Sequence, residues 1–255
     1  PKDTDMTDFS YQLYSSRNFP PLGDTLKMVA DAGYMQVEGY GGLYEGAALA
    51  ELQAGLDATG LTMPTGHFGL SMVRDTPDQA VAVAKKLGIK AVFIPHLMPD
   101  ERPTDAAGWA QFGRDLAEAG KPIWDAGLKF GWHNHDFELA DLGGTDRPLD
   151  LIMQGSDDLA LELDIAWVMR GGQDPLAWVS KYNNRMLAAH VKDIAAPGAC
   201  IDEDGWADVG HGTMDWPALM AALKTGTTRY FVMEHDNPKD HKRFATRSIA
   251  AAQAM

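Results

Sequence analysis

The chain has 255 residues, of which 45% are hydrophobic and 23% charged, so it can bury one large core or two small ones. Its formal net charge of −14 argues against nucleic acid as a partner, because a protein that binds nucleic acid needs a basic surface. The only cysteine, Cys200, excludes an intrachain disulfide and suits a reducing compartment.

Eight short runs rich in apolar, β-branched and aromatic residues predict β-strands. The fourth, sixth and eighth runs open with near-continuous apolar residues, which is typical of parallel strands that are covered on both faces. In chain order the predicted strands lie within residues 8–16, 33–42, 61–69, 90–97, 128–137, 159–167, 186–194 and 230–237.

Amphipathic stretches between these runs predict helices. The first begins with proline and stops at Gly33, and the helix near Asp215 has proline in its first turn after a candidate aspartate cap. The stretch between the fifth and sixth strands, residues 138–155, is irregular and predicts only a short helix. The clearest helices lie within residues 20–33, 47–60, 76–88, 215–224 and 240–255.

Eight strands that alternate with helices over this length predict an α/β fold, a single (β/α)₈ TIM barrel with its active site at the carboxyl ends of the strands. We expect one domain over residues 1–255, with the eight repeats over about 8–237 and a closing helix in 238–255. A doubly wound open sheet is the alternative. The glycine-rich pieces form no strand-linked GxGxxG, so a dinucleotide site has little support.

Ionisable residues gather where the predicted strands end, and six of the eight histidines lie there. In a barrel all of these ends meet on one face. Side chains alternate along a strand, so only part of the set faces one pocket. The set comprises Glu38, His67, His96, His133, His135, Glu138, Glu162, Asp164, His190, Lys192, Asp193, Glu234, His235 and Asp236.

Glu162 and Asp164 share a face of the sixth strand, as Glu234 and Asp236 do on the eighth. One carboxylate from each strand and the imidazole of His190 on the seventh are expected to converge on one ion. Two carboxylates with one imidazole suit Mn²⁺, Mg²⁺ or Co²⁺, and Zn²⁺ is not excluded. Taken singly, each acidic residue is more often a helix cap or a salt-bridge partner, so it is the joint pattern that favours a site.

Five stretches carry a family resemblance: WHNHDFE at 132–138, LELDIAW at 161–167, HVKD at 190–193, VGHGTMDW at 209–216 and VMEHD at 232–236. Together they resemble the xylose-isomerase-like TIM barrels, in the branch of sugar phosphate isomerases/epimerases. The resemblance covers nearly the whole chain. In VGHGTMDW, His211 stands where the family commonly has glutamate.

The resemblance implies one divalent metal ion, held by Glu, Asp, His and Glu from strands five to eight. Asp164, His190 and Glu234 match the last three ligands. The usual first position falls at His133, while a glutamate, Glu138, follows five residues later. We predict that Glu138 is the fourth ligand; in the alternative, His133 is the ligand and Glu138 lines the pocket.

The family's chemistry implies proton abstraction next to a carbonyl of a sugar or keto-sugar, with Mn²⁺ as the expected metal and Mg²⁺, Co²⁺ or Zn²⁺ as alternatives. Glu234 or Glu138 is expected to be the base, and Lys192 either polarises a substrate oxygen or pairs with Asp193 or Glu162. We assign catalytic roles to Glu138, Glu234, His135, His133 and Lys192, and substrate binding to Glu38, His67, His96, Trp167 and His211.

The alternative within enzymes is a lyase or dehydratase that cleaves a keto-glycoside or inosose by metal-assisted β-elimination. A sugar-binding barrel without catalysis has less support, because binding needs no such ion site. A DNA-repair endonuclease of the same fold would need more metal ligands and a basic groove. Phosphate recognition is doubtful, since Arg74, Arg102 and Arg170 are the only basic residues expected nearby.

The expected partner is a small sugar or keto-sugar, with no nucleic acid and no membrane; association into a homo-oligomer is left open. A bilayer span needs about 18 consecutive apolar residues, and no run approaches that length. No signal peptide is visible, so we expect a cytoplasmic protein, or a periplasmic one if a leader has been removed before Pro1.

Overall fold

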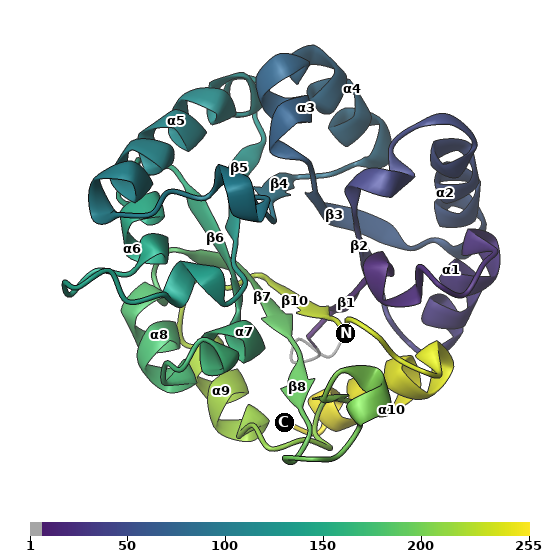
Figure 1. The fold of residues 1–255 in the computed structure, drawn as a ribbon. Coiled ribbons are helices and arrows are strands. Elements are labelled where there is room, and N and C mark those ends of the chain that lie inside the picture. Colours follow the sequence, from purple (N-terminus) through teal and green to yellow (C-terminus); the bar gives the residue numbers. More distant parts are fainter. Residues whose placement is uncertain (1–6) are drawn as a thin grey trace.

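The computed structural model describes residues 7–255, in which eight strands form a closed parallel barrel. Figure 1 looks along this ring and shows the helices arranged around it. The strand order β1-β10-β7-β6-β5-β4-β3-β2 places each strand beside its neighbour in the chain and closes the ring between β1 and β10. The predicted (β/α)₈ TIM barrel is confirmed.

The barrel strands are short, and beyond their first positions all of their residues are buried except Leu187, which is half-buried. They are β1 (Phe9–Gln12), β2 (Gln36–Gly39), β3 (Thr62–His67), β4 (Ala91–Ile94), β5 (Lys129–His133), β6 (Ala160–Asp164), β7 (Met186–Val191) and β10 (Tyr230–Met233). Each lies inside a run that the sequence predicted as a strand.

The α-helices connect successive strands, and several begin at proline or end at glycine as their sequences predicted. Gly60 and Gly88 follow α2 and α4 in the left-handed region, with φ of 74° and 76°, where a side chain would be strained. The helices are α1 (Leu22–Asp31), α2 (Gly46–Thr59), α3 (Leu70–Asp75), α4 (Pro77–Leu87), α5 (Ala106–Asp125), α6 (Pro148–Met153), α7 (Ile165–Arg170), α8 (Pro175–Tyr182), α9 (Trp216–Leu223) and α10 (His241–Gln253).

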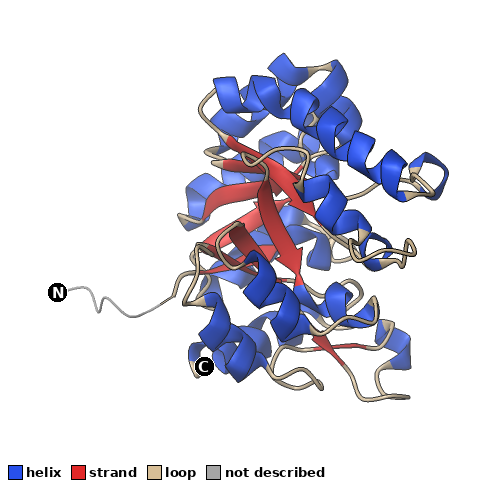
Figure 2. Cartoon of the chain, turned by 90° about the vertical axis from the view of Figure 1, so that its left-hand side faces the viewer, coloured by secondary structure: helices blue, strands red, loops and turns tan. Residues whose placement is uncertain are grey.

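Two predicted strands are shorter than expected. The first run leaves the barrel after Gln12, because Leu13–Ser16 forms a turn of 3₁₀ helix. The seventh run ends as a barrel strand at Val191; Asp193–Ile194 forms a separate strand, β8, antiparallel to β9 (Trp206–Ala207). Figure 2 shows this small sheet set apart from the barrel strands. Lys192 therefore lies at the junction between barrel and hairpin.

The floor of the barrel interior is apolar and its upper part is polar. Ala91, Phe93, Ala160, Ala188, Tyr230 and Val232 form a small cluster of their own, separate from the main core between strands and helices. Because side chains alternate along a strand, the residues two and four positions further on face the same interior. From Ala160 these are Glu162 and Asp164, and from Val232 they are Glu234 and Asp236.

The described residues contain no helix long and apolar enough to cross a membrane. The long helix α5 carries charged residues along its length and packs on α6 and β5.

Candidate metal centre and cavity

The carboxylates of Asp164 and Glu234 meet the imidazole of His190 at the top of the barrel interior. His190 Nδ1 lies 3.3 Å from Glu234 Oε1 and 3.6 Å from Asp164 Oδ2. One donor atom from each residue lies within 4.8 Å of the others, and all three residues are buried. We call these three residues the upper group. The structure thus brings together the three residues that were expected to converge.

His133 lies next to the upper group, and Glu138 does not. His133 Nε2 is 3.9 Å from Asp164 Oδ2. The Glu138 carboxylate turns away, because it accepts the backbone N–H of His135 at 2.7 Å and the indole N–H of Trp132 at 3.3 Å. Burial raises the pKa of Glu138 to about 8. Its carboxylate closes the turn after β5, so the placement favours His133 over Glu138 as the fourth donor.

Asn134, between the two histidines, faces away from the interior and fixes the end of β6. Its side chain accepts the backbone N–H of Asp164 at 2.8 Å and donates to the carbonyl of Asp164 at 3.2 Å. Asp164 Oδ1 then accepts the backbone N–H of Trp167 and caps α7. Oδ2 is left to face His190 and Lys192, so the cap orients the carboxylate toward the interior.

Lys192 is fully buried against three carboxylates. Its ammonium lies 2.7 Å from Glu234 Oε1, 2.9 Å from Asp164 Oδ2 and 3.0 Å from Asp236 Oδ1. Burial alone would lower the pKa of Lys192, but these carboxylates outweigh it and hold the pKa well above its ordinary value. Three carboxylates around one ammonium leave the centre net negative, and together with the imidazoles they fit a divalent cation.

A lower group of polar residues lies beneath the upper one. It has one donor atom from each of four buried residues, and these atoms lie within 4.8 Å of one another: His67, His133, Glu162 and His190. Glu162 Oε1 lies 2.5 Å from His67 Nε2 and 3.1 Å from both His133 Nδ1 and His190 Nε2. Burial would lower the pKa of His67, yet the carboxylates of Glu38 and Glu162 raise it to about 10.

A cavity of about 450 Å³ opens above these groups at the carboxyl ends of the strands. Five of its lining residues, His67, His96, His133, His135 and Glu234, belong to the predicted site, and they lie on the cavity wall. Among residues 7–255, no lysine or arginine lines it. The other lining residues are Tyr14, Tyr40, Gly41, Phe68, Gly69, Pro95 and Asp236.

Tyr14, Tyr40 and Asp236 are lining residues that received no role in the sequence analysis. The two tyrosines pack edge to face with ring centres 5.3 Å apart. Tyr14 lies two residues after β1, and Tyr40 directly follows β2. An aromatic residue in a glycine- or serine-rich turn at a strand end is the sequence signal that could have identified both as lining residues. Asp236 shares the face of Glu234, and burial raises its pKa to about 6, with Glu234 and Asp164 adding to the effect.

Two of the histidines on the cavity wall, His135 and His96, have a pKa below the ordinary value for histidine. Burial lowers the pKa of His135 to about 3, and Lys192 contributes in the same direction. Burial also lowers the pKa of His96, with Arg102 adding to the shift. Both are therefore neutral imidazoles at pH 7 in this structure.

Five residues that were predicted to contact substrate or to carry out catalysis do not line the cavity, and one of them is Glu138, whose carboxylate is held in the turn after β5. Glu38 is fully buried beneath His67 and His190, and Lys192 lies behind Glu234 and Asp236. Trp167 packs on Trp206 with ring centres 4.9 Å apart. His211 is exposed in the loop before α9 and contributes no cavity-lining atom.

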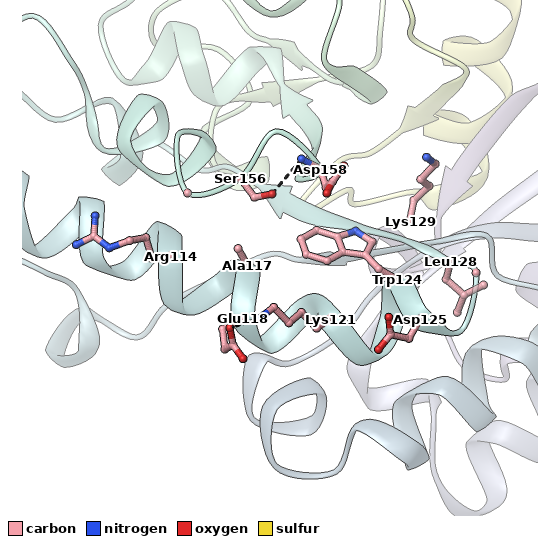
Figure 3. Close-up of a pocket in the computed structure, with 12 residues that line it drawn as sticks. Arg114, Ala117, Glu118, Lys121, Trp124, Asp125, Leu128, Lys129, Ser156 and Asp158 are labelled. Atoms are coloured by element: carbon pink, nitrogen blue, oxygen red, sulfur yellow. Dashed lines mark hydrogen bonds and ion pairs between the residues drawn. The ribbon is translucent and has the colours of Figure 1, made fainter.

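The largest hollow of the described surface lies at the other end of the barrel. It has a volume of about 820 Å³ and is lined by α5, the start of β5 and the turn before β6. Figure 3 shows Trp124 between charged side chains of α5 and Lys129. This is the amino-terminal face, which supports stability in such barrels, and neither donor group reaches it.

A sequence profile of the xylose isomerase-like TIM barrel family matches residues 26–254. The chain belongs to this family. No curated protein sequence matches it. A crystal structure of a sugar phosphate isomerase/epimerase from Parabacteroides distasonis is similar over 100% of this chain and 96% of its own, with a TM-score of 0.81 and 21% identity.

Two further solved structures of this fold are informative. The IolI protein with a bound zinc atom is 17% identical, with a TM-score of 0.73 over 97% of this chain and 96% of its own. The 3-keto-D-glucoside 4-epimerase YcjR from E. coli is 15% identical, with a TM-score of 0.71 over 98% of this chain and 100% of its own. At these identities the likeness establishes the fold.

Proposed function

We propose that this member of the xylose isomerase-like family is a divalent-metal-dependent isomerase or epimerase of a sugar or keto-sugar. The observation that carries the proposal is the position of the upper group: Glu234 lies on the cavity wall while Asp164 and His190 lie buried behind it. The similar structures described as an isomerase/epimerase and as a keto-glucoside epimerase support the choice of reaction.

The upper group with His133 would hold the ion, and Mn²⁺ suits two carboxylates with two imidazoles, with Mg²⁺, Co²⁺ or Zn²⁺ as alternatives. A bound divalent ion supplies Lewis-acid polarisation of a substrate carbonyl. Lys192 balances part of the negative charge and holds Asp164, Glu234 and Asp236 in place through its three short contacts.

The barrel order supports a pair of proton-transfer groups on opposite walls of the cavity. In the closed ring, β10 and β4 are separated by three strands in either direction. Glu234 and Asp236 follow β10, and His96 follows β4, so they face the cavity from opposite sides. Inversion at a carbon needs one group to take a proton and another to return one from the opposite face. In one direction the neutral imidazole of His96 would take the proton and the carboxyl group of Asp236, whose pKa burial raises to about 6, would return one; in the reverse direction a carboxylate would be the base. This placement favours epimerisation.

The cavity wall favours a substrate without phosphate. No described lysine or arginine lines it, although phosphate recognition relies on such cations or on backbone nests. The three arginines considered for phosphate are engaged elsewhere: Arg74 with Asp75, Arg102 over the ring of Phe137, and Arg170 over the ring of Trp206. Tyr14 and Tyr40 offer aromatic faces that suit the C–H face of a sugar ring.

The proposal is tested by incubating the protein with keto-sugars, inososes and glycosides and Mn²⁺ in D₂O, followed by identification of the products. We expect an isomer or epimer that carries deuterium at the inverted or neighbouring carbon. Glu234→Gln is expected to lower turnover by about 100- to 10,000-fold, the usual contribution of a positioned base.

The variant His96→Asn distinguishes proton transfer on one face of the substrate carbon from proton transfer on the other. It is expected to suppress epimerisation by a similar factor of about 100- to 10,000-fold, while exchange of the substrate proton with solvent on the carboxylate face persists. His211→Asn is the matched control, because that histidine is exposed outside the cavity. A leaving group released among the products would favour the lyase reaction over the isomerase reaction. Full activity of Glu234→Gln would refute the assignment of Glu234 as the base.

A further inference from the structure

Two imidazoles of the proposed metal centre each lie between carboxylates above and carboxylates below. His190 turns Nδ1 toward Glu234 and Asp164, and it turns Nε2 toward Glu38 at 2.7 Å and Glu162 at 3.1 Å. His133 turns Nε2 toward Asp164 and Nδ1 toward Glu162. The carboxylates of Glu38 and Glu162 therefore lie beside the ring nitrogens that do not face the upper group.

Glu38 is held rigidly at the bottom of this arrangement. Its Oε1 accepts from the side-chain amide of Gln12 at 2.8 Å, and its Oε2 accepts from the hydroxyl of Thr65 at 2.5 Å. Gln12 is itself fixed, because its amide oxygen accepts the backbone N–H of Tyr14 at 3.0 Å. These contacts leave Glu38 no freedom to turn toward the cavity, from which it is fully buried.

The contact with Glu38 selects one tautomer of His190. An ionised carboxylate only accepts hydrogen bonds, so the short contact requires a hydrogen on His190 Nε2. Nδ1 also faces carboxylates, those of Glu234 and Asp164 at 3.3 and 3.6 Å, so it is the nitrogen whose hydrogen a bound metal would replace. With the hydrogen on Nε2 retained by Glu38, the Nδ1 lone pair would then face the metal. A metal ligand must present such a lone pair, and a carboxylate behind a ligating histidine commonly provides this orientation.

We infer that Glu38 is a positioning residue that sets the affinity of the metal centre by holding His190 in the tautomer whose Nδ1 faces the upper group. The inference rests on the proposed metal centre and assigns Glu38 a role behind the ligands instead of on the substrate. Thr65 and Gln12 support that role by fixing both carboxylate oxygens. Glu162 does not act on His133 in this way: its Oε1 lies 3.1 Å from His133 Nδ1, but that nitrogen has no hydrogen-bond partner.

The experiment measures Mn²⁺ and Co²⁺ affinity of the full chain by calorimetry, and the His190 tautomer by long-range ¹H–¹⁵N NMR of the protein loaded with diamagnetic Zn²⁺. In Glu38→Leu we expect the dissociation constant to rise by about 10- to 100-fold, as for other residues behind a metal ligand, and the Nε2–H tautomer to give way to a mixture. Glu38→Gln is the rescue variant, because its amide oxygen can still accept from Gln12 and His190 while its amide group faces Thr65.

Two further variants control for folding. Asp150→Leu removes a buried carboxylate that accepts from Arg147 N–H and Tyr182 in the outer helical layer, so it is expected to lower stability with unchanged metal affinity. Should Glu38→Leu fail to fold, Thr65→Val removes one hydrogen bond to Glu38 and is expected to weaken metal binding by about two- to tenfold.

Unchanged affinity and tautomer in Glu38→Leu, or in Thr65→Val if Glu38→Leu does not fold, would overturn the inference. So would two bound ions in the wild type with one lost in the variant, because Glu38 would then be a ligand of a second ion. Weakened metal binding in a protein that turns over no sugar would leave the inference standing and reject the proposed function. Sugar turnover with unaltered metal binding in the variant would reject the inference alone.

Discussion

His133 and Glu138 belong to one polar segment, yet they face different surroundings. His133 ends β5 and points into the barrel, where Asp164 lies 3.9 Å away. Glu138 lies in the following 3₁₀ turn, where two N–H groups hold its carboxylate. Gly131 precedes them at a point where any Cβ would collide with the carbonyl of Ala160. Local backbone geometry therefore decides which of the two donors reaches the upper group.

The variants His133→Gln and Glu138→Gln are expected to differ in metal affinity. Loss of a residue that supports a metal ligand typically weakens metal binding by about 10- to 100-fold. Because His133 is the proposed ligand itself, we expect His133→Gln to weaken Mn²⁺ binding by at least that factor. Glu138→Gln is expected to bind Mn²⁺ as the wild type does, because its side chain lies outside the upper group. Calorimetric titration of both variants distinguishes them, and the reverse result would make Glu138 the fourth ligand.

The loop before α9 is organised around one carboxylate. Asp193 begins β8 and accepts four backbone N–H groups, from Ile194, Gly210, Gly212 and Met214, at 2.9 to 3.2 Å. Gly210 has φ of 83°, and a Cβ at Gly212 would collide with the Asp193 carboxylate. The motif VGHGTMDW is thereby explained as a loop wrapped on Asp193, with His211 turned to solvent.

Asp193→Ala should lower the free energy of unfolding by about 2–3 kcal/mol, because it leaves several backbone N–H groups without an acceptor. Urea unfolding of the variant provides the measurement. His211→Ala, in the same loop, is expected to change the free energy of unfolding by less than about 0.5 kcal/mol, as is usual for exposed positions. Equal stability of Asp193→Ala and the wild type would contradict this account of the loop.

At the scale of the whole molecule, the barrel concentrates negative charge in its own interior. Glu38, Glu162, Asp164 and Glu234 are all buried, within a chain whose net charge is −14. Buried like charges are costly unless cations or hydrogen bonds compensate them. Here the buried cations are Lys192 and the imidazoles of His67 and His190, whose pKa values neighbouring carboxylates raise despite burial. A divalent ion in the upper group would relieve part of this cost, so metal binding and folding stability should be linked.

Mn²⁺ at about 100 times its dissociation constant should raise the free energy of unfolding by about 2.7 kcal/mol. For a domain of this size that corresponds to an increase in Tm of about 5–11 °C. Scanning calorimetry with Mn²⁺ and with EDTA measures the difference. The double variant Asp164→Asn/His190→Gln should show no such increase; an equal increase there would place the ion elsewhere.

The amino-acid sequence by itself determined the barrel architecture and indicated which polar residues lie at the carboxyl ends of its strands. Strand periodicity, glycine stops and proline starts are local signals, so the eight barrel strands and five helices could be placed without tertiary information. Alternation along a strand also explains why Glu162 and Asp164 both lie near His190, whereas the carboxylate of Asp193 faces the loop before α9.

Only the tertiary structure decided which polar residues reach the cavity. Glu38 and His190 are 152 positions apart, and closure of the ring brings them into contact. Depth within the barrel then separates Glu38, which is buried, from Asp236 and Tyr40, which line the cavity. The small β8–β9 sheet also escaped prediction, because two-residue strands carry no periodicity. Sequence pattern indicates the face of a strand, whereas packing around the ring sets the depth and neighbours of each side chain.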